Sequence, residues 1–151
     1  MKVENFVAEY GDQVLTVSPN NTVAEVARKF GEEIGNRRYS VAVVCEANDK
    51  VVGVVSLGDI TWTVGRLEDK APSIEVHHIM TSEVQSCTMD DLLEDVLKRM
   101  AKAGIRHMPV VKDGKLAGLV ARREALEFLY KWAKLDVENL TVWLFDSHAR
   151  Y

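Results

Sequence analysis

The chain has 151 residues, of which 47% are hydrophobic and 28% are charged, and its formal net charge is −4 at pH 7. This balance is typical of a soluble globular protein, and no apolar run approaches the roughly 20 residues that a membrane-spanning helix requires. The negative charge argues against a nucleic-acid partner, because such binding depends on clustered Lys and Arg that neutralise phosphates. No apolar signal-peptide core follows the first residues, so we expect a cytoplasmic protein with no membrane partner.

The first elements along the chain are a strand and a helix. An apolar strand over residues 14–17 ends at a polar cluster, in which Ser18 and Asn21 are suitable helix N-caps. The helix after this cluster is expected to end at Gly35. Its apolar residues recur at helical spacing, and they are Val23, Val26, Ala27 and Phe30.

A hairpin and a closing helix follow. Two apolar, Val-rich runs, 40–44 and 50–56, are joined by the turn Glu46-Ala47-Asn48-Asp49. Such runs around a turn predict two antiparallel strands. The second strand leads into a helix at about 58–67.

The second half of the chain repeats this order. Residues 14–26 align with 84–96 without a gap, at an offset of 70. Later segments align at offsets of 67 and 65, which places three extra residues after the first helix and two in the first hairpin. These segments are 40–44 with 107–111 and 50–56 with 115–121, and Val3, Phe6 and Val7 fall against Val76, Ile79 and Met80. Self-similarity of this kind indicates a duplicated unit.

The second copy also carries its own local signals. A strand over 84–87 precedes Thr88 and Asp91, which are suitable N-caps, and the helix after them is expected to end at Gly104. The apolar residues of this helix are Leu93, Val96, Leu97 and Met100. Asp113-Gly114 is a strong hairpin-turn signal.

The fold class that follows is α/β (α+β), with two β-α-β-β-α repeats. One repeat alone would leave a face of its sheet uncovered, so we expect the two to pack together. The linker around Lys70-Ala71-Pro72-Ser73 is short, which suits two halves of one module. We expect the units to span 3–68 and 74–134, followed by a helical tail over 135–151.

The C-terminal region is rich in large apolar residues. An amphipathic closing helix is expected over 122–134, and Asp136-Val137-Glu138-Asn139 resembles a new helix start. The apolar residues are Ala125, Leu126, Leu129, Tyr130, Trp132 and Ala133 in the first part and Leu140, Val142, Trp143, Leu144 and Phe145 in the second. They either pack on the chain's own core or form a homodimer contact, and the homodimer is the favoured hypothesis.

Each half resembles the cystathionine-β-synthase (CBS) domain, and the pair resembles a Bateman module. The resemblance rests on the polar helix entry after the first strand, on residues 107–111 (HMPVV) and on residues 53–59 (GVVSLGD). It implies two clefts that bind an adenosyl ligand, of the AMP, ATP, NAD or S-adenosylmethionine class, and a dimer shaped as a flat four-domain disc. It also implies a regulatory role through an unknown protein partner, with no required cofactor.

In the first cleft the resemblance implies that Asp59 accepts ribose hydroxyls and that Ser56 contacts phosphate. A carboxylate is a natural acceptor for a vicinal diol, and a helix N-terminus favours phosphate; both residues could also serve only as helix caps. Gly58 stands where many relatives carry Arg, so we expect either weaker phosphate binding here or a charge supplied by Arg37 or Arg38. The expected adenine contacts are Thr16, Val17, Tyr39, Ser40 and Val41.

The second cleft departs from this pattern. Ala121 replaces the hydroxyl residue and Glu124 replaces the Asp, whereas Arg122 and Arg123 supply cations. The expected adenine contacts here are Ser86, Cys87, His107, Met108 and Pro109. We therefore expect two unequal sites.

Other chemistries find little support in the sequence. His77, His78 and His107 do not match a zinc spacing with Cys or acidic residues, so no metal site is expected. Cys45 and Cys87 are expected to be small buried hydrophobes rather than a disulfide. Nucleophile, Walker and dinucleotide motifs are absent from the sequence, so an enzyme is the least favoured hypothesis. The main alternative to a sensor is a structural dimerisation module with degenerate, non-binding clefts.

Overall fold

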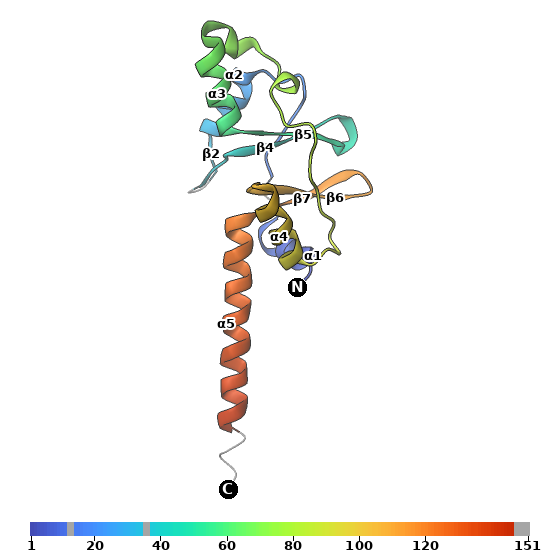
Figure 1. The fold of residues 1–151 in the computed structure, drawn as a ribbon, viewed down its shortest axis with the longest axis vertical. Coiled ribbons are helices and arrows are strands. Elements are labelled where there is room, and N and C mark those ends of the chain that lie inside the picture. The colour runs from blue at the N-terminus through green and yellow to red at the C-terminus, as the bar shows by residue number, and fades with distance from the viewer. Residues whose placement is uncertain (12–13, 35–36, 147–151) are drawn as a thin grey trace.

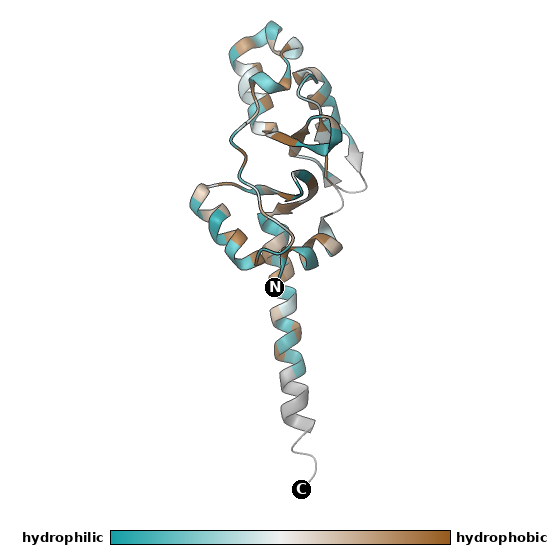
Figure 2. Cartoon of the chain, turned by 90° about the vertical axis from the view of Figure 1, so that its right-hand side faces the viewer, coloured by the Kyte–Doolittle hydropathy of each residue, from teal (hydrophilic) through white to brown (hydrophobic). Residues whose placement is uncertain are grey.

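The computed structural model describes residues 1–11, 14–34 and 37–146, apart from the side chains of 33–34, 37 and 140–146. Each half of the chain contributes a β-hairpin with helices on its outer side, and the two hairpins face each other at the centre (Figure 1). Apolar residues concentrate in these central strands (Figure 2). The expected α/β fold with two packed repeats is therefore confirmed.

The first repeat forms a three-stranded sheet of order β1-β4-β5, in which β1 is parallel to β4 and β5 is antiparallel to it. Along the chain, a short two-stranded ribbon, β2-β3, lies between the helix α2 and the strand β4. The elements are α1 (Val3–Tyr10), β1 (Thr16–Val17), α2 (Val23–Gly31), β2 (Glu33–Ile34), β3 (Arg37–Arg38), β4 (Val41–Cys45), η1 (Ala47–Asp49), β5 (Val51–Ser56) and α3 (Leu57–Leu67).

The second repeat is built around the hairpin β6-β7. Its first expected strand, 84–87, is reduced to one parallel bridge between Cys87 and Val110. The hairpin turn is as predicted, with left-handed φ values of 52° at Asp113 and 77° at Gly114. The elements are η2 (Glu68–Ser73), η3 (Val76–His78), α4 (Leu93–Ala103), β6 (His107–Lys112), β7 (Lys115–Ala121) and α5 (Arg122–Asp146).

The helix boundaries correct two details of the sequence analysis. The N-cap of α2 is Thr22, which forms a capping box with Glu25, whereas Asn21 accepts a hydrogen bond from the Ser18 amide in the preceding turn. The N-cap of α4 is Leu92, and Asp91 instead accepts from the Thr88 amide. The polar clusters thus form turns, and the helices begin one residue later than expected.

The helix ends differ between the repeats. Helix α4 ends at Gly104, as predicted, with a left-handed φ of 67° that a side chain would strain. Helix α2 ends at Gly31, because Glu32 is extended and the chain enters β2. The expected stop at Gly35 lies outside the described residues.

The two lead-in segments are exchanged between the cores. Val3 and Phe6 of α1 are buried in the second repeat's core, beside residues such as Met100 and Phe128. Val76 of η3 is buried in the first repeat's core, with Val26 and Phe30. The units expected at 3–68 and 74–134 therefore interlock, because each lends an apolar segment to the other's core.

Equivalent glycines make room for these exchanged segments. A Cβ on Gly53 of β5 would lie 2.3 Å from Met80 Sδ, and a Cβ on Gly118 of β7 would lie 3.1 Å from Val7 Cγ1. Gly53 and Gly118 align in the repeat, as do Met80 and Val7. The exchange is thus nearly symmetric, and it ties the two repeats into one body.

Helix α5 is continuous from Arg122 to Asp146, so the new helix start expected at Asp136–Asn139 is wrong. Neither Gly nor Pro interrupts this stretch, and an ion pair of 3.9 Å between Lys134 and Glu138 spans the expected break. Its first turns pack on the core through Ala125 and Phe128. The rest projects away from the body (Figure 1).

Candidate ligand-binding clefts

The larger opening between the repeats, cleft 1, has a volume of about 810 Å³. Small-molecule sites in proteins typically occupy roughly 300–1,000 Å³, so a nucleotide-sized ligand fits this space. Its lining residues come from both repeats: Ser40, Val41, Val54, Ser56, Leu57, Gly58, Asp59, Thr61, Trp62, Thr81, Arg106 and His107.

Cleft 1 contains the N-terminus of α3. Ser56 is the N-cap and forms a capping box with Asp59, whose amide donates to Ser56 Oγ at 3.2 Å. In return Asp59 Oδ2 accepts from the Ser56 amide at 2.8 Å and from Ser56 Oγ at 2.9 Å. The capping role considered for both residues is therefore real. These contacts all fall on one carboxylate oxygen, and Asp59 lines the cleft at the same time.

The arginine of cleft 1 comes from the opposite repeat. Arg106, one residue before β6, lines the cleft beside the α3 N-terminus. Arg38, which the sequence analysis expected here, instead lines the second cleft, and the side chain of Arg37 lies outside the described part. Each cleft thus combines the start of one repeat's closing helix with an arginine that precedes the other repeat's middle strand.

The second opening, cleft 2, has a volume of only about 140 Å³. This volume is below the range typical of small-molecule sites. Its lining residues are Phe6, Tyr10, Gly11, Leu15, Arg38, Tyr39, Ser40, Val41, His107, Leu119, Ala121 and Glu124.

The aromatic lead-in helix accounts for this small volume. Tyr10 stacks on Phe6 with ring centroids 5.5 Å apart and meets the Phe128 edge at 5.9 Å. Lys131 donates a hydrogen bond to the Tyr10 hydroxyl, and its Nζ lies 5.2 Å from the centre of the Tyr10 ring. These contacts hold two rings in the wall of cleft 2, whereas the corresponding lead-in at cleft 1 is the three-residue turn η3.

The start of α5 offers cleft 2 fewer ligand contacts than α3 offers cleft 1. Ala121 has no hydroxyl, and Glu124 is the charged residue of this helix turn that lines the cleft. Arg123 is directed elsewhere, since its side chain is 84% exposed and pairs with Glu127 at 3.1 Å. Neither Arg123 nor Arg122 lines the cleft, so the two cations do not take the place expected for a phosphate contact.

His107 lies where the two clefts meet and lines both. Burial lowers the pKa of this imidazole, and Arg106 acts in the same direction, while Glu124 opposes the shift. The neutral form is therefore favoured in the fold. Ser40 and Val41 also line both clefts.

Most of the remaining expected contacts lie away from the cleft linings. Thr16 is exposed and Val17 belongs to the first core. Cys87 and Met108 belong to the second core, Pro109 is buried, and Ser86 is partly buried. Tyr39, expected in cleft 1, lines cleft 2.

Burial also sets the state of the two cysteines. Cys45 and Cys87 are both free. Cys87 is 2% exposed, and burial raises the pKa of its thiol to about 12. The half-buried Cys45 has its pKa raised by burial as well. Both thiols therefore stay protonated near neutral pH and act as apolar groups.

Trp62, Thr81 and Arg106 are among the residues lining cleft 1 that the sequence analysis missed. Trp62 lies one helical turn after Asp59 and is 63% exposed, with the Arg66 guanidinium 4.8 Å from its ring centre. Because Trp62 lies three residues after Asp59 on the same helix, the sequence could have predicted that it lies near the cleft. Thr81 pairs with Val54 through the exchanged lead-in, and Arg106 crosses from the other repeat, so neither had a local sequence signal.

Comparison with known proteins places these clefts in a wider setting. The CBS domain pattern matches the chain twice, at residues 7–64 and 76–131. The 17.7 kDa protein in the bps2 3′ region of Acidianus ambivalens is 33% identical over 129 residues, which cover 85% of this chain and 71% of that protein. The chain spans only 36% and 57% of two further relatives, from Methanocaldococcus jannaschii and Methanopyrus kandleri.

Solved structures share the fold. The CBSX2 complex with AMP has a TM-score of 0.73 and 22% identity, and the match covers 87% of this chain and 98% of that one. The CBS domain pair of MJ0100, in complex with 5-methylthioadenosine and S-adenosylmethionine, has a TM-score of 0.73, 19% identity and coverages of 87% and 97%. Across the described residues, no helix has the length and apolar character needed to cross a membrane.

Proposed function

The chain belongs to the CBS-domain family, with two copies of the domain, and on this premise we propose that it is a regulatory module that binds an adenosine-containing ligand in cleft 1. One observation carries the proposal: a cleft of about 810 Å³ brings Ser56, Asp59, Thr81 and Arg106 together from both repeats. We assign no reaction to it, and the cytoplasmic location stays a prediction from the sequence.

The chemistry of cleft 1 suits a ribose and a phosphate. Asp59 can accept hydrogen bonds from vicinal hydroxyls through the carboxylate oxygen that the helix cap does not use. Arg106 and the N-terminus of α3 favour a negatively charged group. A ligand that touches both repeats favours the arrangement in which cleft 1 is closed around it, which gives binding a structural output.

Two fold neighbours support the ligand class. CBSX2 was solved with AMP, and the MJ0100 domain pair with 5-methylthioadenosine and S-adenosylmethionine. All three ligands contain adenosine, with or without a phosphate. We propose the same class for this chain, with AMP, ATP, NAD and S-adenosylmethionine as the candidates.

A thermal-shift titration with these four ligands tests the proposal. A ligand that binds only the folded chain stabilises it by about 2.7 kcal/mol at a concentration 100 times its Kd. For a chain of this size that corresponds to a rise in Tm of roughly 5–11 °C. If none of the four raises the Tm, the alternative is supported instead: a structural module with degenerate clefts. The small volume of cleft 2 already favours this alternative for one half.

We also propose that the chain forms a homodimer through helix α5. Leu126 and Tyr130 are 54% and 71% exposed, so the alternative, packing on the chain's own core, does not hold for these side chains. With Ala133 they begin a stripe whose steps of four and three residues continue in sequence to Leu140 and Leu144. This alternation is the pattern of a two-stranded coiled coil.

Sedimentation of paired variants tests the dimer. Replacing Leu126 and Tyr130 with Glu places two charges on the proposed stripe and is expected to give a monomer at micromolar concentration. Leu135→Glu is the matched control, because Leu135 is 50% exposed on the opposite side of the same helix. A monomeric wild-type chain, or a control that dissociates equally, would contradict the proposal.

A further inference from the structure

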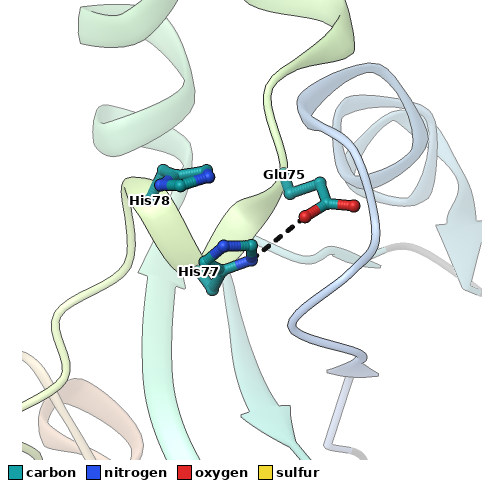
Figure 3. A group of neighbouring side chains, drawn as sticks. All are labelled: Glu75, His77 and His78. Carbon is teal, nitrogen blue, oxygen red and sulfur yellow. Dashed lines mark ion pairs between the residues drawn. The ribbon is translucent and has the colours of Figure 1, made fainter.

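Glu75, His77 and His78 form a cluster at η3, in the lead-in segment of the second repeat (Figure 3). One ligand atom from each side chain lies within 4.8 Å of the others. His77 Nδ1 lies 3.4 Å from Glu75 Oε2, and the two imidazole rings lie with their centroids 4.0 Å apart. None of the three lines cleft 1 or cleft 2.

The spacing of these atoms is close to that of a metal site. Tetrahedral coordination with bonds of about 2.0–2.2 Å separates the ligand atoms by roughly 3.3–3.6 Å. His77 Nδ1 lies 3.1 Å from the Pro19 carbonyl oxygen, which only accepts a hydrogen bond, so the nitrogen of His77 free to bind an ion is Nε2. The side chains of His77 and Glu75 are 36% and 45% exposed, so an ion in solvent can reach both.

The backbone beneath the cluster is held in place. Val76, between two of the ligands, is fully buried, and its amide donates to Asn21 O at 2.8 Å. The His77 amide donates to Pro19 O at 3.0 Å, and His77 Nδ1 lies 3.1 Å from the same oxygen. The three side chains therefore start from a fixed turn, and ordering them for an ion costs little backbone entropy.

The donor set selects the class of ion. Two imidazole nitrogens and one carboxylate suit Zn²⁺ and neighbouring divalent transition metals. Mg²⁺ and Ca²⁺ prefer oxygen ligands throughout. Three protein ligands leave a coordination position for water or a further group, as in open zinc sites.

We propose that Glu75, His77 and His78 bind one divalent transition-metal ion of the Zn²⁺ class at η3 of each chain. The sequence analysis expected no metal site because it sought zinc spacings and did not pair the two histidines with Glu75. This site is separate from the proposed adenosyl cleft, and its binding is measured independently. Thr81 of cleft 1 follows His78 by three residues, so the ion would lie beside the segment that forms one wall of that cleft.

The test is isothermal titration of the full chain, without a histidine tag, with ZnCl₂. The expected result is one Zn²⁺ per chain and no binding of Mg²⁺ at the same concentrations. His77→Ala and His78→Ala are each expected to weaken binding by about tenfold or more, since loss of a mere supporting group typically costs that much. Co²⁺ provides a second readout, because histidine ligation changes its visible absorption.

Matched variants separate a built site from surface binding. Glu75→Gln removes the carboxylate charge and is expected to weaken Zn²⁺ binding, whereas Glu83→Gln, an exposed acid of the same segment, is expected to leave it unchanged. The melting curve of each variant without metal shows that it folds. Absence of Zn²⁺ binding, or equal affinity in wild type and both histidine variants, would overturn the proposal.

Discussion

Cleft 1 and cleft 2 occupy equivalent positions in a duplicated molecule, yet their volumes are about 810 and 140 Å³. At cleft 1 the closing helix begins with the Ser56–Asp59 capping box and the lead-in is a short turn. At cleft 2 the closing helix begins after Ala121, and the lead-in is a two-turn helix that carries Phe6 and Tyr10. The two clefts thus differ in both the start of the closing helix and the lead-in segment beside it.

Under the proposed function, the difference assigns binding to one cleft and packing to the other. The rings that fill cleft 2 pack on Phe128 and Lys131 of α5, and so they stabilise the base of the projecting helix. The groups that line cleft 1 cap α3 and remain exposed to a ligand. We infer that cleft 1 binds the ligand. The side chains of cleft 2 instead stabilise the base of α5, the helix that we propose as the dimer contact.

The largest effect on this comparison is expected from Asp59→Ala. Loss of a charged hydrogen-bond partner costs about 1–3 kcal/mol, so adenosyl-ligand affinity measured by calorimetry should fall roughly 5- to 150-fold. The change also removes the α3 capping box. Glu25→Ala is the matched control, because it removes the equivalent capping box of α2 outside both clefts. Equal affinities of the two variants would remove Asp59 from the site.

The next effect concerns the crossing arginines. Arg106→Gln is expected to weaken AMP binding by about tenfold, the value of one charge-assisted hydrogen bond of roughly 1.5 kcal/mol, and to leave adenosine binding nearly unchanged. Arg38→Gln alters the arginine that lines cleft 2 and should change neither affinity. A larger loss from Arg38→Gln than from Arg106→Gln would show that the ligand occupies the other cleft.

Opening cleft 2 tests whether the difference is reversible. Tyr10→Ala removes a ring from the cleft wall, while Ala121→Ser and Glu124→Asp restore the pattern of cleft 1. The triple variant is expected to bind a second, weaker adenosyl ligand by calorimetry, whereas Tyr10→Ala alone should bind one. A folded triple variant that still binds one ligand per chain would show that other residues keep cleft 2 closed.

The smallest effect is a pH dependence from His107, which the clefts share. Burial lowers its pKa below the ordinary value of about 6.5, so below that pH the unfolded chain binds a proton that the folded chain resists. His107 therefore lowers the stability of the folded chain as the pH falls from about 6.5 toward the lowered pKa. Above about pH 6.5 it has no such effect. In His107→Gln the Tm should fall less steeply with pH over this window, and equal slopes would contradict the assignment.

The order of elements could be predicted from the sequence because it depends on local patterns. Helical and strand periodicity, Asp113-Gly114 and Gly104 placed both hairpins and the end of α4 correctly. The observed N-caps lie one residue after the expected Asn21 and Asp91, because these two side chains accept hydrogen bonds in the turns before each helix. The continuous α5 was missed because acidic residues suitable for a helix start also suit a helix interior stabilised by i,i+4 pairs.

The site was less predictable, because its parts come together only through tertiary packing. Ser56 and Asp59 were found, since their spacing is local and falls at one helix start. Arg106 and Thr81 enter cleft 1 from the other repeat and from the exchanged lead-in. An alignment shows that two segments are alike, but not which core each one joins.

The stoichiometry of adenosyl-ligand binding tests the inequality of the clefts most directly. Isothermal titration of the wild-type chain with the ligand that raises its Tm most should give one site per chain, weakened roughly 5- to 150-fold in Asp59→Ala and unchanged in Glu25→Ala. Two equivalent sites per chain, or one site whose affinity is unchanged in Asp59→Ala, would contradict the assignment of binding to cleft 1.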